Sequence, residues 1–183
     1  MFMEDDRDMK IAGDDFEPTN TGRPQQDDDA LLLGQEKENG NLSRARRLGA
    51  IMADEVSAVE GDARTADSAL LTQRRILLAF AVEVGLDSLL PNNLVAQTAQ
   101  TVFYDTLRVT APQFYDDLQA SGAFSFYYLC VRDGRQVEEK VGETFASLCG
   151  RKGDADYARL GSELYRRFSA QVKHFVDTLE FVR

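Results

Sequence analysis

From residue 43 onward, apolar positions recur every three or four residues along most of the chain. This is the period of one face of an α-helix. Between residues 43 and 60 the period is preceded by Ser43, a residue type that caps helix starts, and followed by Gly61, a type found just past helix ends. We therefore expect a first helix here, with an apolar face made by Leu48, Ile51 or Met52, Val56 and Val59.

A second helix is predicted from about residue 67 to Val84, with Gly85 as its stop signal. Every residue after Arg75 is apolar up to Val84, except Glu83. A helix that is apolar on all sides is buried on most of its faces. We therefore place this helix in the centre of the fold.

Five more helices follow from the same reasoning. A proline inside a helix clashes with the carbonyl four residues earlier, so Pro112 separates two of them. The apolar segment 123–131 fits a buried strand or a short buried helix equally well by its pattern. We choose a helix, because its neighbours are helical and no partner strand is evident. The predicted ranges are about 91–109, 112–119, 123–131, 137–149 and 154–179.

The predicted fold is all-α, a single helical-bundle-like domain of six to seven helices over residues 43–183. The sequence shows neither alternation of strands with helices nor a repeat of 20 to 50 residues. A body of this size buries about two-thirds of the surface of its unfolded chain, which is enough for it to fold alone.

Residues 1–42 have a different composition. Residues 1–40 contain twelve Asp and Glu against four Lys and Arg, whereas the rest of the chain has nineteen against seventeen. A segment this acidic and poor in apolar residues cannot offset its chain entropy by burial, so we expect a largely disordered tail. The exception is Leu31, Leu32 and Leu33. They fit either a linear motif that docks in a partner's groove or a cap on the domain's own surface.

One short motif occurs twice. Phe103-Tyr104-Asp105 returns eleven residues later as Phe114-Tyr115-Asp116. Successive residues of a helix point about 100° apart, so each copy reads as a core, a boundary and a solvent position. We interpret the motif as packing. The alternative is an aromatic-lined pocket around Glu83, in which the hydroxyl groups belong to Tyr104, Tyr115, Tyr127 and Tyr128.

Glu83 is the one charged residue in a segment that should be buried. A buried carboxylate without a partner is costly. We therefore expect Glu83 either to pair with an arginine, for example Arg108, or to line a cavity.

The sequence offers little for catalysis or metal binding. His174 is the only histidine, and Cys130 and Cys149 are the only cysteines, with no ligand spacing among them. Glu139 and Glu143 lie one helical turn apart, but without the Glu-x-x-His pattern of metal sites in bundles. Phosphate-binding loops and serine-hydrolase motifs are absent. We assign no catalytic residue, metal ligand or cofactor, and an enzyme ranks third among the functions considered.

The charge of the chain and its targeting signals indicate the compartment of the protein and the kind of partner that it binds. The acidic N-terminus has no apolar signal region, and the longest apolar run has seven residues, so we expect a soluble protein of the cytoplasm. The basic cluster at residues 43–47 is outweighed by a net charge of −10, which makes nucleic-acid binding an unlikely activity. The leading hypothesis is a non-enzymatic interaction module that binds a protein partner or itself. The alternative is a domain that binds a small molecule in the aromatic-lined cavity.

Overall fold

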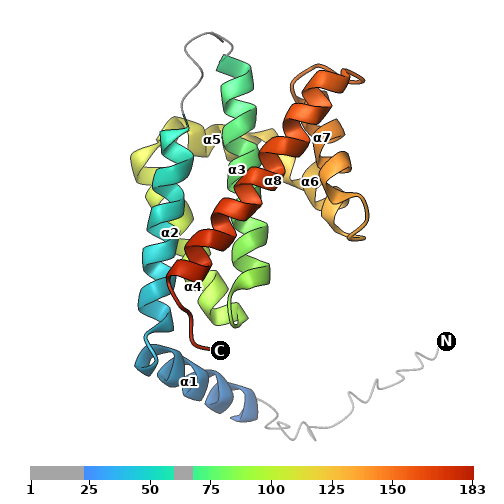
Figure 1. Ribbon diagram of the computed structural model, residues 1–183. Helices are drawn as coiled ribbons and strands as arrows, with labels where there is room; N and C mark the ends of the chain where they lie inside the picture. The colour runs from blue at the N-terminus through green and yellow to red at the C-terminus, as the bar shows by residue number, and fades with distance from the viewer. Residues whose placement is uncertain (1–22, 60–67) are drawn as a thin grey trace, which may run out of the picture.

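The computed structural model describes residues 23–59 and 68–183, which form eight α-helices and no strand (Figure 1). None of these helices is both long and apolar enough to cross a membrane. In chain order they are α1 (Arg23–Glu38), α2 (Asn41–Ala58), α3 (Ser68–Leu89), α4 (Asn93–Thr110), α5 (Pro112–Ser121), α6 (Ala123–Val131), α7 (Val137–Leu148) and α8 (Ala155–Thr178).

The all-α prediction is confirmed, and α2 to α8 correspond to the seven predicted helices. Segment 123–131, for which the pattern also allowed a strand, is helix α6. Gly61, the suggested end of the first predicted helix, and residue 67, where the second was predicted to begin, lie outside the described residues. The count of six to seven helices is one short, because it omits α1.

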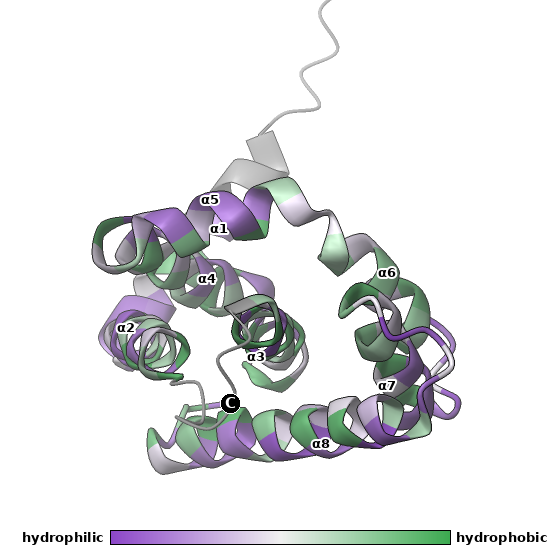
Figure 2. Ribbon diagram, turned by 90° about the horizontal axis from the view of Figure 1, so that it is seen from above, coloured by the Kyte–Doolittle hydropathy of each residue, from purple (hydrophilic) through white to green (hydrophobic). Residues whose placement is uncertain are grey.

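Helix α3 occupies the centre of the domain, as its uniformly apolar composition indicates. Seen from above, it has α2 and α4 on one side, α8 on another and α6 and α7 on a third (Figure 2). All seven residues from Ile76 to Val82 are buried. Phe80 is completely buried and packs its ring against aromatic rings of α6 and α8.

Gly85 does not end α3, which continues to Leu89. Its role is to let two helices approach closely. A Cβ atom placed on Gly85 would lie 2.6 Å from Cγ1 of Val172 on α8, a separation that real side chains do not tolerate. The stop signal was wrong because the need for contact between α3 and α8 overrides the weak helix propensity of glycine.

Glycine serves the same purpose at two other helix contacts. A Cβ atom on Gly49 of α2 would lie 2.3 Å from the carbonyl oxygen of Ala99 on α4. One on Gly142 of α7 would lie 2.2 Å from the carbonyl oxygen of Ala158 on α8. The backbones of both helix pairs therefore touch directly. Glycine is found at these positions despite its low helix propensity, because no larger residue would fit.

Helix α1 corrects the expectation that residues 1–42 are largely disordered, as far as Arg23–Glu38 is concerned. Pro24 stands in its first turn, where a missing N–H costs nothing. Gly40, with φ of 81°, makes the turn into α2. The helix is held at its end by Glu36, which is buried although it is charged. Residues 1–22 lie outside the described part of the chain.

A polar network around Glu36 joins α1 to three other parts of the fold. The carboxylate accepts hydrogen bonds from the side-chain amides of Asn39 (3.2 Å), Asn41 (2.6 Å) and Asn92 (2.8 Å). Asn92 also caps α4, since its side chain accepts from the backbone N–H of Val95. Several N–H donors around one carboxylate compensate the loss of its hydration.

Candidate functional site

Glu83 of α3 is met by two tyrosines from different helices. The hydroxyl of Tyr104 on α4 donates to Oε2 of Glu83 across 2.5 Å, and the hydroxyl of Tyr128 on α6 lies 3.3 Å from Oε1. The suggested partner Arg108 instead pairs with Asp105, three residues earlier on α4, at 2.9 Å. That suggestion was wrong because Arg108 and Asp105 are neighbours on the exposed side of α4, whereas Tyr104 faces α3.

Both tyrosines are held in the protonated form. Burial, then the charge of Glu83 and the hydrogen bond to it, raise the pKa of Tyr104 far above its ordinary value. The same causes, with a smaller contribution from Asp87, raise the pKa of Tyr128 to about 12. Phenols with such pKa values are hydrogen-bond donors at neutral pH and poor bases, so this cluster is suited to holding helices together or binding a ligand.

The two remaining residues of the predicted pocket lie apart from Glu83. Tyr115 is half-buried and near enough to Tyr104 to contribute to its raised pKa. Tyr127 is completely buried with its ring centroid 5.1 Å from that of Phe80. Its hydroxyl has no hydrogen-bond partner among the described residues. The structure thus brings Glu83, Tyr104 and Tyr128 together, and a ligand cavity around them stays a prediction.

The doubled motif follows the predicted order of core, boundary and solvent. Phe103 and Phe114 are buried, the tyrosine after each is half-buried, and the aspartate after that is exposed. The motif is therefore explained by packing in α4 and α5, and Tyr104 gains its contact with Glu83 from its boundary position.

Helix α6 is apolar on its outer side as well as its inner side. It buries Ala123, Tyr127 and Cys130, yet Phe126 is 55% exposed and Leu129 62% exposed. Phe126 and Leu129 lie about 60° apart around the helix axis, whereas Tyr128, although 44% exposed, points towards Glu83 of α3. The helix lies at the edge of the molecule (Figure 2). We call Phe126 and Leu129 the α6 face.

A groove runs from the α6 face towards α7. It has a volume of about 500 Å³ and is lined by Phe126 of α6, by Thr144 and Leu148 among other residues of α7, and by Lys152 of the following loop. The groove extends the apolar surface and adds one positive charge, Lys152, and one negative charge, Glu143. An apolar strip with a charged rim is typical of protein interaction sites.

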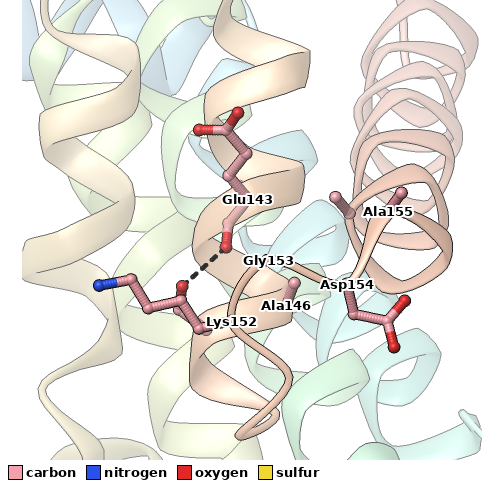
Figure 3. Close-up of a pocket in the computed structure, with 8 residues that line it drawn as sticks. Glu143, Ala146, Lys152, Gly153, Asp154 and Ala155 are labelled. Atoms are coloured by element: carbon pink, nitrogen blue, oxygen red, sulfur yellow. Dashed lines mark hydrogen bonds between the residues drawn. The ribbon is translucent and has the colours of Figure 1, made fainter.

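A second hollow, of about 540 Å³, lies between α7 and the start of α8 (Figure 3). It shares Glu143, Ser147 and Lys152 with the groove. No aromatic side chain occurs among its described lining residues, and the side chains of Lys152 and Asp154 point away from one another. Polar groups that diverge do not orient a small ligand, so this hollow is a weak candidate for a small-molecule site.

The three leucines of α1 differ in exposure. Leu31 is 72% exposed and Leu33 48% exposed, while Leu32 is half-buried. They stand on a regular helix, a form that can also dock in a partner's groove, and only Leu32 covers the domain's own surface. The triplet remains a prediction for partner binding.

The histidine and the two cysteines lie in different surroundings in the described part of the chain. No group of three or more His, Cys, Asp and Glu side chains is placed to hold a metal ion there. His174 is exposed. Cys130 is buried, with its sulfur 3.2 Å from the hydroxyl of Thr144.

Two arginines of the basic clusters have structural roles. Arg44 donates to the carbonyl of Asn39 at 2.7 Å, and Arg75 donates to the carbonyls of Val56 and Ser57 at the end of α2. An arginine that binds the last carbonyls of a helix stabilises its C-terminus. Arg46 and Arg47 of the cluster at residues 43–47 are exposed.

The sequence reasoning treated 123–131 as buried and so missed Phe126 and Leu129. One signal was available: a nine-residue helix with eight apolar residues cannot bury all of its sides unless other elements surround it. No family model matches the chain, and neither a curated protein nor a solved structure matches it either. Function has to be argued from these surfaces alone.

Proposed function

We propose that the protein is a non-enzymatic helical interaction module that binds a protein partner through the α6 face and the adjoining groove. The observation that carries this proposal is the exposure of Phe126 and Leu129 on the most apolar helix of the described chain. Large apolar side chains that stand together on a surface lose hydration free energy when a partner covers them.

The other features of the site fit a protein partner better than a small molecule. The carboxylate of Glu83 is already bonded to the two tyrosines that would have oriented a ligand. A ligand entering there would have to replace these hydrogen bonds, whereas a partner on the α6 face leaves them intact.

The test compares two variants of the full-length chain. Partners are captured from a lysate of the source cells, identified, purified and titrated against the pure protein. We expect Phe126→Ser combined with Leu129→Ser to weaken binding by about tenfold or more, which is about 1.4 kcal/mol. Val109→Ser is the matched control, because Val109 is 79% exposed at the end of α4, outside the α6 face. A purified partner that binds both variants equally well contradicts the proposed surface.

Small-molecule binding remains the second candidate, supported by the buried and unpaired hydroxyl of Tyr127. Buried polar groups usually have a partner, and a ligand atom or a water molecule would provide one. Native mass spectrometry of the purified protein distinguishes the two. A reproducible mass excess that is lost on denaturation favours the ligand, and a bare chain favours the protein partner.

A further inference from the structure

We infer that the α6 face binds the chain's own residues 1–22 within the same molecule. This inference rests on the proposed function, since it names an occupant for the same surface. It makes the acidic N-terminal segment a built-in competitor of any external partner.

Charged residues lie near the α6 face. Beyond Leu129 the chain carries Arg132 and Arg135 on the turn after α6, both exposed. Neither guanidinium forms an ion pair within the described residues, because the aspartate between them, Asp133, pairs with Lys140 at 2.8 Å. Lys152 stands at the other end of the groove. Two arginines unpaired within the described residues thus follow the end of α6, while Lys152 and Glu143 balance each other in the groove's described lining and Glu138 and Glu139 are exposed at the start of α7.

Residues 1–22 have the complementary composition. They contain seven Asp and Glu against two Lys and Arg, a net charge of −5. Among these acids stand large apolar residues, including Phe2, Ile11 and Phe16. A partner for the α6 face needs apolar side chains to cover Phe126 and Leu129 and carboxylates to meet the arginines. This segment supplies both.

The segment is also long enough. An extended chain of 22 residues spans about 70 Å. Helix α8, with 24 residues, is about 36 Å long and sets the scale of the domain. From its attachment at Arg23 the segment therefore reaches the α6 face. A tethered ligand has an effective concentration in the millimolar range, so even weak contacts suffice for occupancy.

The chain contains no tryptophan, which allows a direct experiment. Phe16→Trp in the full-length protein places a single fluorescent reporter within the segment. We expect its emission to be shifted to shorter wavelength and protected from acrylamide, a neutral quencher. Adding Phe126→Ser and Leu129→Ser removes the shift and the protection, and so does Arg132→Glu with Arg135→Glu, which leaves the apolar strip intact. Val109→Ser leaves both unchanged, and about 1 M NaCl weakens the protection, because it screens charge beyond about 3 Å.

Three results overturn the inference: a reporter as accessible to quencher as a free peptide, protection that survives both double variants, and protection that disappears on dilution. The last of these indicates binding between molecules. Circular dichroism confirms that each variant is folded. If the reporter is accessible while Phe126→Ser with Leu129→Ser weakens binding of a purified partner by about tenfold or more, only this inference fails and the proposed function stands.

Discussion

The side-chain amide of Asn41 lies 2.6 Å from the carboxylate of Glu36, and both residues are buried. Asn41 also exchanges two hydrogen bonds with the backbone of Val182, at 2.8 and 2.9 Å. Two residues five positions apart thus connect α1, the start of α2 and the C-terminal end of the chain. Helix α1 is attached mainly by polar contacts, since Glu36 is its one buried residue among those described.

Glu36→Gln is expected to destabilise the fold by about 1–3 kcal/mol, because glutamine replaces one acceptor oxygen with an amide that faces the donors of the asparagines. Chemical denaturation measures this loss. Glu38→Gln is the matched control, since Glu38 is exposed two residues away. Equal stability of the two variants would show that the network contributes nothing.

Gly85→Ala is expected to lower stability by about 1–3 kcal/mol, although alanine is the better helix former. The reason is steric: the new Cβ would lie 2.6 Å from Cγ1 of Val172, which is buried. Adding Val172→Ala makes room, so the double variant should lose less than the sum of the two single losses.

The control for Gly85→Ala is Gly34→Ala. Gly34 is also within a helix, but nothing lies within 4 Å of the position of its Cβ. This variant should be as stable as the wild type or gain up to about 1 kcal/mol. If both variants gain stability, the close approach of α3 and α8 does not require glycine.

The tyrosine–glutamate cluster is tested by a double-mutant cycle of Glu83→Gln and Tyr104→Phe. A hydrogen bond to a charged group contributes about 1.5–3 kcal/mol. We therefore expect each variant to lose about that amount, and the double variant to lose much less than the sum. The same cycle with Arg108→Gln in place of Tyr104→Phe should be additive, because Arg108 pairs with Asp105. Additivity in both cycles would contradict the contact.

The same tyrosines predict a loss of stability at high pH. The pKa of Tyr128 rises from 10.0 to about 12 in the folded protein, and that of Tyr104 rises further. The folded state therefore holds these protons more tightly than the unfolded state. Their contribution to stability is complete below pH 10 and falls as the pH rises from there towards 12. Denaturation midpoints should be measured at a series of pH values from about 8 upward. We expect the midpoint to decrease once the pH exceeds about 10, and we expect this decrease to be less steep in the double variant Tyr104→Phe with Tyr128→Phe. An identical slope in the two proteins would contradict this linkage.

The helices were predictable because their pattern is local. The spacing of apolar residues, the helix-capping residues and the break at Pro112 predicted α2 to α8. The apolar run from Ile76 to Val82 indicated a central helix. Helix α1 was missed because its acidic, glycine-containing sequence carries no apolar face, and its attachment depends on Asn92 and Val182, 56 and 141 residues from their partners Glu36 and Asn41. The spacing of apolar residues along the sequence does not reveal hydrogen bonds between residues so far apart.

The candidate site was predictable in part. The isolated charge in an apolar segment singled out Glu83, and the boundary position of Tyr104 followed from helical geometry. The choice of partner did not follow, because the rotation of α4 and α6 about α3 decides whether a tyrosine or an arginine meets the carboxylate. The exposed side of α6 also depends on which neighbours cover it, and this is a property of the whole fold.

The bonds between Asn41 and Val182 place the two ends of the α2–α8 domain side by side. A short linker would therefore close residues 41–182 into a ring without stretching the fold, and new ends could be opened at a turn elsewhere. By the same geometry, the domain could be inserted into a surface loop of another protein, with α1 and the acidic segment left out.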